Sequence, residues 1–180
     1  MDRRTLLGAG IGASLLGTGV LGAAPAFASP AVGKPAPKFT LHTFDRQKIT
    51  LADLAGKVIV LNYWATWCGP CKLELPLIDA YVRHKGGGDL KVFAITVDNT
   101  VSDYELKPLA DVLSFPLISK IDSWSYGDLG AIPTNYVIDR SGILRYAKAA
   151  AFTTVAAFDA VVGPLLAEAP PAAGPAATAS

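Results

Sequence analysis

Positions 58–64 form a continuous apolar run, with Val, Ile, Val, Leu, Asn, Tyr and Trp in succession. Such a run is typical of a strand buried on both faces of a sheet, so we predict a central strand over Val58–Trp64. Positions 90–97 alternate enough to predict a second strand. Between them, apolar residues at steps of three and four predict a helix that Pro76 should kink and Gly86–Gly88 should end. Its stripe contains Cys71, Leu75, Ile78 and Val82, joined by Glu74, Leu77 and Tyr81.

Shorter patterns predict the remaining strands. We expect a leading pair of edge strands at Phe39–Leu41 and Lys48–Leu51, and a small strand at Phe115–Ser119. Asn135–Asp139 and Ile143–Lys148 flank a turn with a glycine at a position that can take a positive φ, which predicts a hairpin. The whole order indicates an α/β sandwich with a mixed central sheet flanked by helices.

Two further helices carry start signals. Ser102 followed by Glu105 offers a capping box for a short helix, which Pro108 should interrupt. Thr153 or Thr154 should cap a last helix. The buried face of that helix is expected to carry Val155, Phe158, Val162 and Leu165.

The first 28 residues have the three parts of an export signal. Arg3 and Arg4 precede a weakly apolar middle, and Ala26–Ala28 offers a small-residue cleavage site. The arginine pair followed by Thr, Leu and Leu resembles a twin-arginine signal, with a general secretory signal as the alternative. An uncleaved membrane anchor is another alternative, although six glycines between positions 6 and 22 leave little apolar area for a span. We expect an exported protein in the periplasm or another extracytoplasmic space.

Residues 169–180 contain only Ala, Pro, Gly, Thr and Ser, which predicts a disordered tail. What remains, residues 32–167, has the size of a single domain. The 180 residues include 16 Lys and Arg against 15 Asp and Glu, without a basic block. Because binding to a phosphate backbone depends on clustered basic side chains, nucleic acid is not an expected partner. We expect a monomer.

The two cysteines, Cys68 and Cys71, lie three residues apart where the central strand leads into the helix. The unpaired N–H groups and the dipole of a helix N-terminus favour a negative sulfur, so Cys68 should be an accessible thiolate with a lowered pKa. Gly69 allows close approach, and Pro70 suits the first helical turn. Cys71, on the apolar stripe, should resolve a mixed disulfide from within the molecule. A zinc site, a copper site or a structural disulfide is the alternative, although the other potential soft ligands are only His42 and His84.

The sequence around these cysteines resembles the TlpA/ResA-like thiol–disulfide oxidoreductases of the thioredoxin superfamily, with a domain like those of the AhpC/TSA redoxins. The resemblance covers most of positions 32–166 and is carried by four segments. They are Ala36–Leu41, Asn62–Cys71 with its Trp-Cys-Gly-Pro-Cys run, Glu74–Pro76 and Ile132–Thr134. It implies a thioredoxin-like three-layer sandwich. It also implies that Pro133 is a cis-proline facing the disulfide, where the backbone of Ile132 would meet an extended substrate.

Asn62 departs from the pattern of cytoplasmic thioredoxins, which have a buried aspartate six residues before the first cysteine. Because an amide cannot take up a proton, another group must deprotonate Cys71, and Glu74 on the same helical stripe is the candidate. The resemblance implies this role too. Burial should raise the pKa of Glu74. The alternative is a solvated glutamate that the helix dipole stabilises.

The expected activity is the reduction of disulfides in other exported proteins, such as clients of cytochrome c maturation. Gly69 and Pro70 supply no charged or donating side chain between the cysteines, as strong oxidants of this superfamily tend to have. Electrons should come from a thiol-type donor in the membrane, and Trp67 should help to dock substrates. We expect no cofactor and no resident metal. A module that handles Cu(I) and a peroxide-reducing redoxin are the alternatives, the latter without the usual Thr-x-x-Cys and arginine setting.

Overall fold

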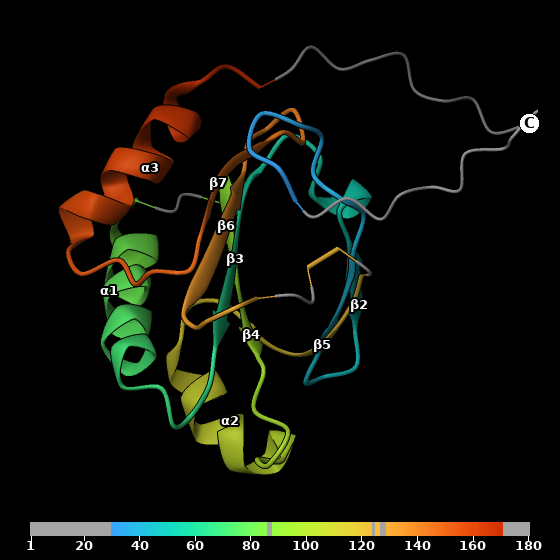
Figure 1. Ribbon diagram of the computed structural model, residues 1–180, viewed down its shortest axis with the longest axis vertical. Coiled ribbons are helices and arrows are strands. Elements are labelled where there is room, and N and C mark those ends of the chain that lie inside the picture. The colour runs from blue at the N-terminus through green and yellow to red at the C-terminus, as the bar shows by residue number, and fades with distance from the viewer. Residues whose placement is uncertain (1–29, 86–87, 124, 127–128, 171–180) are drawn as a thin grey trace, which may run out of the picture.

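The computed structural model describes residues 30–85, 88–123, 125–126 and 129–170. Seven strands form one sheet in the order β2-β1-β5-β4-β3-β6-β7 (Figure 1). β3 and β4, and β4 and β5, are parallel pairs, whereas the remaining neighbours are antiparallel. The strands are β1 (Thr40–Thr43), β2 (Lys48–Thr50), β3 (Val58–Trp64), β4 (Leu90–Thr96), β5 (Leu117–Asp122), β6 (Thr134–Ile138) and β7 (Leu144–Lys148).

Three α-helices contribute to the hydrophobic core on one face of the sheet: α1 (Gly69–Lys85), α2 (Asp103–Val112) and α3 (Val155–Ala167). Figure 1 shows α1 and α3 on the same side of the sheet. The buried side chains of each helix pack on the side chains that β3 and β4 present to that face. These helical side chains include Leu75 and Ile78 of α1, Leu106 of α2, and Phe158 and Val162 of α3.

The opposite face of the sheet has a second core in which aromatic rings meet edge to face. Tyr136 packs against Tyr63 and Tyr126, and Tyr126 packs against Phe39. Irregular segments and the short 3-10 helix η1 (Ala52–Leu54) cover this face in the described part of the chain. The mixed sheet agrees with the sequence analysis, whereas the α-helices of the described residues pack on one face of the sheet and not on both.

The predicted helix starts are confirmed. Ser102 accepts a hydrogen bond from the N–H of Glu105, and both halves of the capping box are present. Thr154 caps α3 by accepting from the N–H of Ala157. The hairpin of β6 and β7 is also as predicted, with Gly142 at φ 79°.

Three expectations for the elements are wrong. β1 is not an edge strand, because it pairs with both β2 and β5. Pro108 does not interrupt α2, which runs on to Val112. The carbonyl that Pro108 leaves without an intrahelical donor belongs to Tyr104, whose side chain is exposed, so water can replace that donor. Val155 is 47% exposed, because the buried face of α3 begins one turn later at Phe158.

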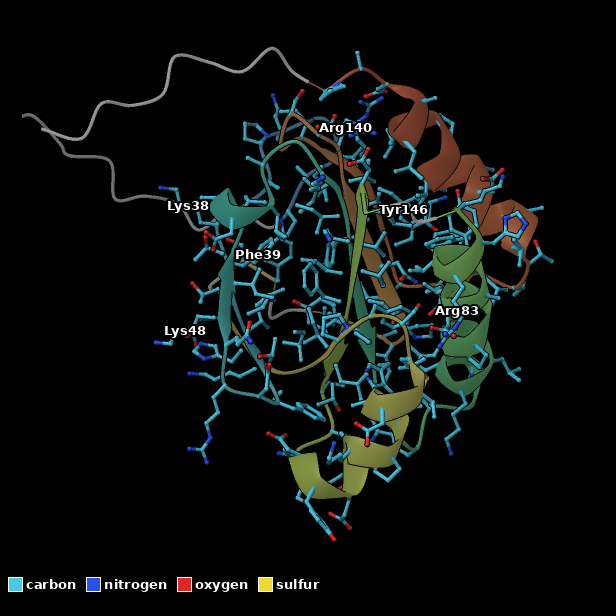
Figure 2. All side chains as sticks on the ribbon, turned by 180° about the vertical axis from the view of Figure 1, so that it is seen from behind. Lys38, Phe39, Lys48, Arg83, Arg140 and Tyr146 are labelled. Carbon is cyan, nitrogen blue, oxygen red and sulfur yellow. A yellow bond between two sulfur atoms is a disulfide. The ribbon has the colours of Figure 1, made fainter. Side chains whose placement is uncertain are left out.

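Arg140 and the turn that carries the cysteines lie at opposite ends of the sheet. Arg140, labelled in Figure 2, lies at the end where α3 finishes, and its guanidinium donates to the carbonyls of Leu166 and Gly56. The carboxyl ends of β3 and β4 lie at the opposite end, and β3 leads there into α1. The turn with the cysteines is therefore at the end remote from Arg140.

Some expectations fall outside the described residues. These are the export signal at positions 1–28 and positions 171–180 of the predicted tail. Among the residues that the structure describes, no helix is long and apolar enough to span a membrane.

Candidate active site

Cys68 and Cys71 form a disulfide at the start of α1, with their Cα atoms 5.3 Å apart. β3 ends at Trp64, and the N–H of Cys68 donates to the carbonyl of Ala65 at 3.1 Å, which closes a short turn before the helix. Cys68 therefore precedes the first helical residue, and Cys71 lies on the buried face of α1, as predicted.

The N-terminus of α1 directs a donor at the sulfur of Cys68. The N–H of Cys71 lies 3.2 Å from Cys68 Sγ. This is one of the first N–H groups of a helix, which have no intrahelical acceptor and carry partial positive charge. In the reduced protein the same arrangement would favour a Cys68 thiolate. The space beside Gly69 is open, since a Cβ placed there would meet no atom within 4 Å.

Cys68 is less accessible than the sequence suggested. In the disulfide form 5% of Cys68 and none of Cys71 is exposed. The reason is that Cys68 is bonded to a cysteine on the buried face of α1, so its sulfur is drawn toward the core. The exposed apolar side chain beside it is Trp67, at 68%, whereas Trp64 is buried in the same core cluster as both cysteines.

Glu74 is buried one turn after Cys71 and is held by donors from three other segments. Asn62 Nδ2 on β3 donates to its Oε2 at 2.8 Å, and Asn135 Nδ2 on β6 donates to its Oε1 at 2.8 Å. The backbone N–H of Phe152 also donates to Oε1, at 2.7 Å. With 1% of the residue exposed, Glu74 is not the solvated surface glutamate of the alternative expectation.

Burial governs the charge of Glu74. Loss of solvation raises its pKa above the ordinary value, and the hydrogen bonds from Phe152, Asn135 and Asn62 oppose this only in part. The partners named here are all donors, so the arrangement fits an ionised carboxylate, and no cation among the described residues is a cause of the shift. A carboxylate without a cation in the core takes up a proton more readily than one in water.

Asn135 and Phe152 complete this site, and the sequence analysis missed both. Asn62 and Asn135 are register partners on β3 and β6, and Asn62 Nδ2 also donates to Asn135 Oδ1 at 2.9 Å. An asparagine at the start of the predicted strand, directly before Tyr136, Val137 and Ile138, was the signal that could have drawn attention to position 135. Phe152 acts through its backbone, which no side-chain pattern reveals. Its ring stacks on Tyr146, which Figure 2 shows on the side of the sheet toward the helices.

The peptide bond between Ile132 and Pro133 is cis, as the resemblance implied. Ile132 is half-buried and packs against the core cluster that includes both cysteines. Pro133 is buried, and β6 begins at the next residue. The two histidines of the sequence lie away from the cysteines. His42 Nε2 pairs with Asp122 at 2.6 Å, and His84 is in the last turn of α1.

The model of the AhpC/TSA family matches residues 32–147. The chain belongs to this family. It is 33% identical over 117 residues to the thioredoxin-like protein YneN of Bacillus subtilis, with 63% of this chain and 68% of that protein covered. It is 37% identical over 118 residues to the thiol–disulfide oxidoreductase ResA of Bacillus thuringiensis, with 61% of this chain and 65% of that protein covered.

Solved structures of thiol:disulfide interchange proteins have the same fold as this chain. A structure from Chlorobium tepidum, described as a putative thiol:disulfide interchange protein DsbE, superposes with a TM-score of 0.64 at 25% identity, covering 77% of this chain and 99% of that one. The expected resemblance to ResA-like proteins and the thioredoxin-like fold are thus confirmed. The names of these relatives support the expected enzyme class, thiol–disulfide oxidoreductase.

Proposed function

We propose that the chain is an exported thiol–disulfide oxidoreductase that reduces disulfides in other exported proteins through Cys68 and Cys71. One arrangement carries the proposal: a disulfide at the N-terminus of α1, with the Cys71 N–H on Cys68 Sγ and the buried Glu74 one turn further on. It offers a stabilised thiolate, a resolving thiol and a proton acceptor within the first two turns of α1.

Cys68 would act first. In the dithiol form its thiolate attacks one sulfur of the client disulfide, a bond forms between Cys68 and that sulfur, and the other client sulfur leaves as a thiolate. The donor at 3.2 Å from Cys68 Sγ favours the thiolate before attack. The open space beside Gly69 leaves room for the client at this point.

Cys71 would then release the client. Its thiol loses a proton to the carboxylate of Glu74, and the resulting thiolate attacks Cys68, which restores the disulfide and expels the second client sulfur. Two electrons have passed from the dithiol to the client. The raised pKa of Glu74, caused by its burial, suits a group that must accept a proton near neutral pH. Holding the two cysteines in one turn makes the second step intramolecular and fast.

Trp67, Ile132 and Pro133 would form the docking surface, with Gly69 and Pro70 between the sulfurs. Trp67 supports this by being 68% exposed beside a buried disulfide, a position that presents apolar area to a partner. The predicted export signal at positions 1–28 supports a site of action outside the cytoplasm. A dithiol of a membrane protein would then reduce the Cys68–Cys71 disulfide after each cycle, and cytochrome c maturation is the proposed client pathway.

The test is to trap the client. Cys71→Ser is expressed with its native N-terminal region in the source organism, and adducts that release on reduction are identified. We expect exported proteins joined to Cys68 that are absent from Cys68→Ser and from the double variant. Purified, reduced protein should convert a client disulfide to thiols, and Cys71→Ser should lower multiple-turnover reduction by at least about 100-fold, because the mixed disulfide then lacks its resolving thiol.

The same purified protein separates the two alternatives. Turnover of hydrogen peroxide by the dithiol without any client would favour the redoxin, and tight binding of Cu(I) by the reduced protein that is lost in Cys71→Ser would favour the copper module. Failure to reduce any protein disulfide, together with either result, would replace the proposed function.

A further inference from the structure

Asp98 is a buried carboxylate outside the cysteine motif, and its hydrogen bonds join it to the turn that carries Cys68. It follows the end of β4, and 5% of the residue is exposed. Its Oδ2 accepts from the hydroxyl of Thr66, which lies two residues before Cys68. Its Oδ1 accepts from the N–H and the hydroxyl of Thr100, at 3.1 and 2.6 Å.

The turn between β3 and α1 is thereby fixed along its length. The N–H of Val97 donates to the carbonyl of Trp64 at 2.9 Å, which extends the contact of the two strands to the start of the turn. Thr66 is held by Asp98 in the middle of the turn, and the N–H of Cys68 donates to the carbonyl of Ala65 at its end. A side chain from the neighbouring strand end thus holds the middle of the turn that carries Cys68.

Asp98 also brings negative charge to this end of the sheet. The hydrogen bonds from Thr100 and Thr66 lower the pKa of Asp98 to about 2, so it is ionised at every physiological pH. Its partners are hydroxyl and N–H donors, and no cation of the described residues contributes to its pKa. A fixed negative charge that accepts a hydrogen bond from Thr66, two residues before Cys68, opposes formation of the thiolate, and a destabilised thiolate makes a dithiol a stronger reductant.

We propose that Asp98 is a positioning residue which, through Thr66, holds Cys68 at the N-terminus of α1 and whose charge limits the ionisation of that cysteine. Positioning at the helix end lowers the pKa of Cys68, whereas the charge of Asp98 raises it, so separate variants are needed to resolve the two effects. The consequence for electron transfer rests on the proposed function, whereas the effects on Cys68 can be measured without a client.

The experiment measures the rate at which iodoacetamide alkylates Cys68 across pH in full-length Cys71→Ala protein. Thr66→Val removes the hydroxyl and keeps the shape, so Cys68 loses its fixed place at the helix end, and we expect the midpoint of the pH–rate profile to rise by about half a pH unit. Asp98→Asn removes the charge and keeps hydrogen-bonding capacity, so the midpoint should fall and the thiolate fraction at neutral pH should rise about threefold. Thr66→Ser keeps the hydroxyl and should stay within about twofold of the parent rate.

The outcomes distinguish this inference from the proposed function. Thr66→Val with the parent profile, or Asp98→Asn with an unchanged or higher midpoint, would overturn the role of Asp98. Circular dichroism checks folding, and Thr66→Ser and Asp98→Asn change so little shape that they keep the test usable if Thr66→Val does not fold. If the profiles shift as expected while reduced wild-type protein reduces no protein disulfide, the proposed function fails and the role of Asp98 stands.

Discussion

Two buried carboxylates lie on either side of the cysteine turn, and their surroundings give them opposite properties. Glu74 lies in the core, where desolvation raises its pKa despite donors from Asn62, Asn135 and Phe152. Asp98 lies at a strand end, where hydroxyl and backbone donors lower its pKa to about 2. Both are less than a tenth exposed, so exposure alone does not decide the charge of a carboxyl group here.

The depth of burial explains the difference. Asp98 is at the surface end of β4, beside the exposed Thr100, and its carboxylate accepts hydrogen bonds from Thr100 and Thr66. Glu74 is enclosed by α1, β3, β6 and the segment before α3, and loses far more hydration. Loss of hydration raises the pKa of a carboxyl group and makes it a better proton acceptor, whereas a carboxyl group that gains hydroxyl and N–H donors stays ionised. The first suits a proton acceptor, and the second suits an anchor.

The largest expected effect comes from removing the exchangeable proton. Glu74→Gln keeps the size of the side chain and should slow resolution of a mixed disulfide by about 100-fold near neutral pH, because general-base assistance contributes roughly that factor or more. The limb of the pH–rate profile that reports the titration of Glu74 should disappear. Stopped-flow measurement of the release of an aromatic thiol from its mixed disulfide with Cys68 follows this step directly.

The matched control for this variant is Asp98→Asn, which is also an acid-to-amide change beside the same turn. It should keep the pH limb of the resolving step, since Asp98 is already ionised throughout that range. Equal loss of the limb in both variants would mean that Glu74 is not the group that accepts the proton in this step.

Stability gives the next largest effect. Asn62→Leu removes the donor to Glu74 Oε2 and to Asn135 Oδ1, and leaves buried acceptors unsatisfied. Such a loss costs about 2 kcal/mol, so the free energy of unfolding in urea should fall by roughly that amount. Thr100→Val at the Asp98 site should cost clearly less, because Thr100 is exposed and water can take the place of its hydroxyl. A smaller loss in Asn62→Leu than in Thr100→Val would contradict the comparison.

The elements on which this comparison rests were predictable from the sequence to different degrees. The bounds of β3 are those of the apolar run, and α1 follows the cysteines, because both patterns are local and strong. Burial of Glu74 also followed from its place on the helical stripe. Local periodicity is sufficient to predict the burial of a side chain wherever its own helix or strand determines its surroundings.

The partners of the two carboxylates were not predictable in the same way. Asn135 meets Glu74 only because β6 pairs with β3 in one register, and a slip of one residue would turn its side chain to the other face. The contact of Asp98 with Thr66 depends on β4 lying beside β3. The exposure of Cys68 was overestimated for a related reason, since the bond to Cys71 draws its sulfur inward. These facts depend on pairing across the sheet or on the disulfide.

The smallest expected effect is the change of the free energy of unfolding with pH, which compares the two carboxylates directly. For Glu74 the native pKa lies above the ordinary 4.5, so the native state holds its proton longer than the unfolded chain. Its contribution to stability is complete below about pH 4.5 and is lost as the pH rises through the native pKa. For Asp98 the native pKa is about 2 and the ordinary value is 3.8, so its contribution is present above 3.8 and is lost as the pH falls toward 2.

Urea unfolding of the oxidised protein and of each acid-to-amide variant, across a series from about pH 2.5 to pH 8, separates these signs. The free energy of unfolding of wild type minus that of Glu74→Gln should decrease with rising pH above about 4.5. The difference from Asp98→Asn should instead increase with pH below 3.8 and be flat above it. Constant offsets from the substitutions do not matter, because only the slopes are compared. If both slopes had the same sign, then depth of burial would not be what separates the proton acceptor from the anchor.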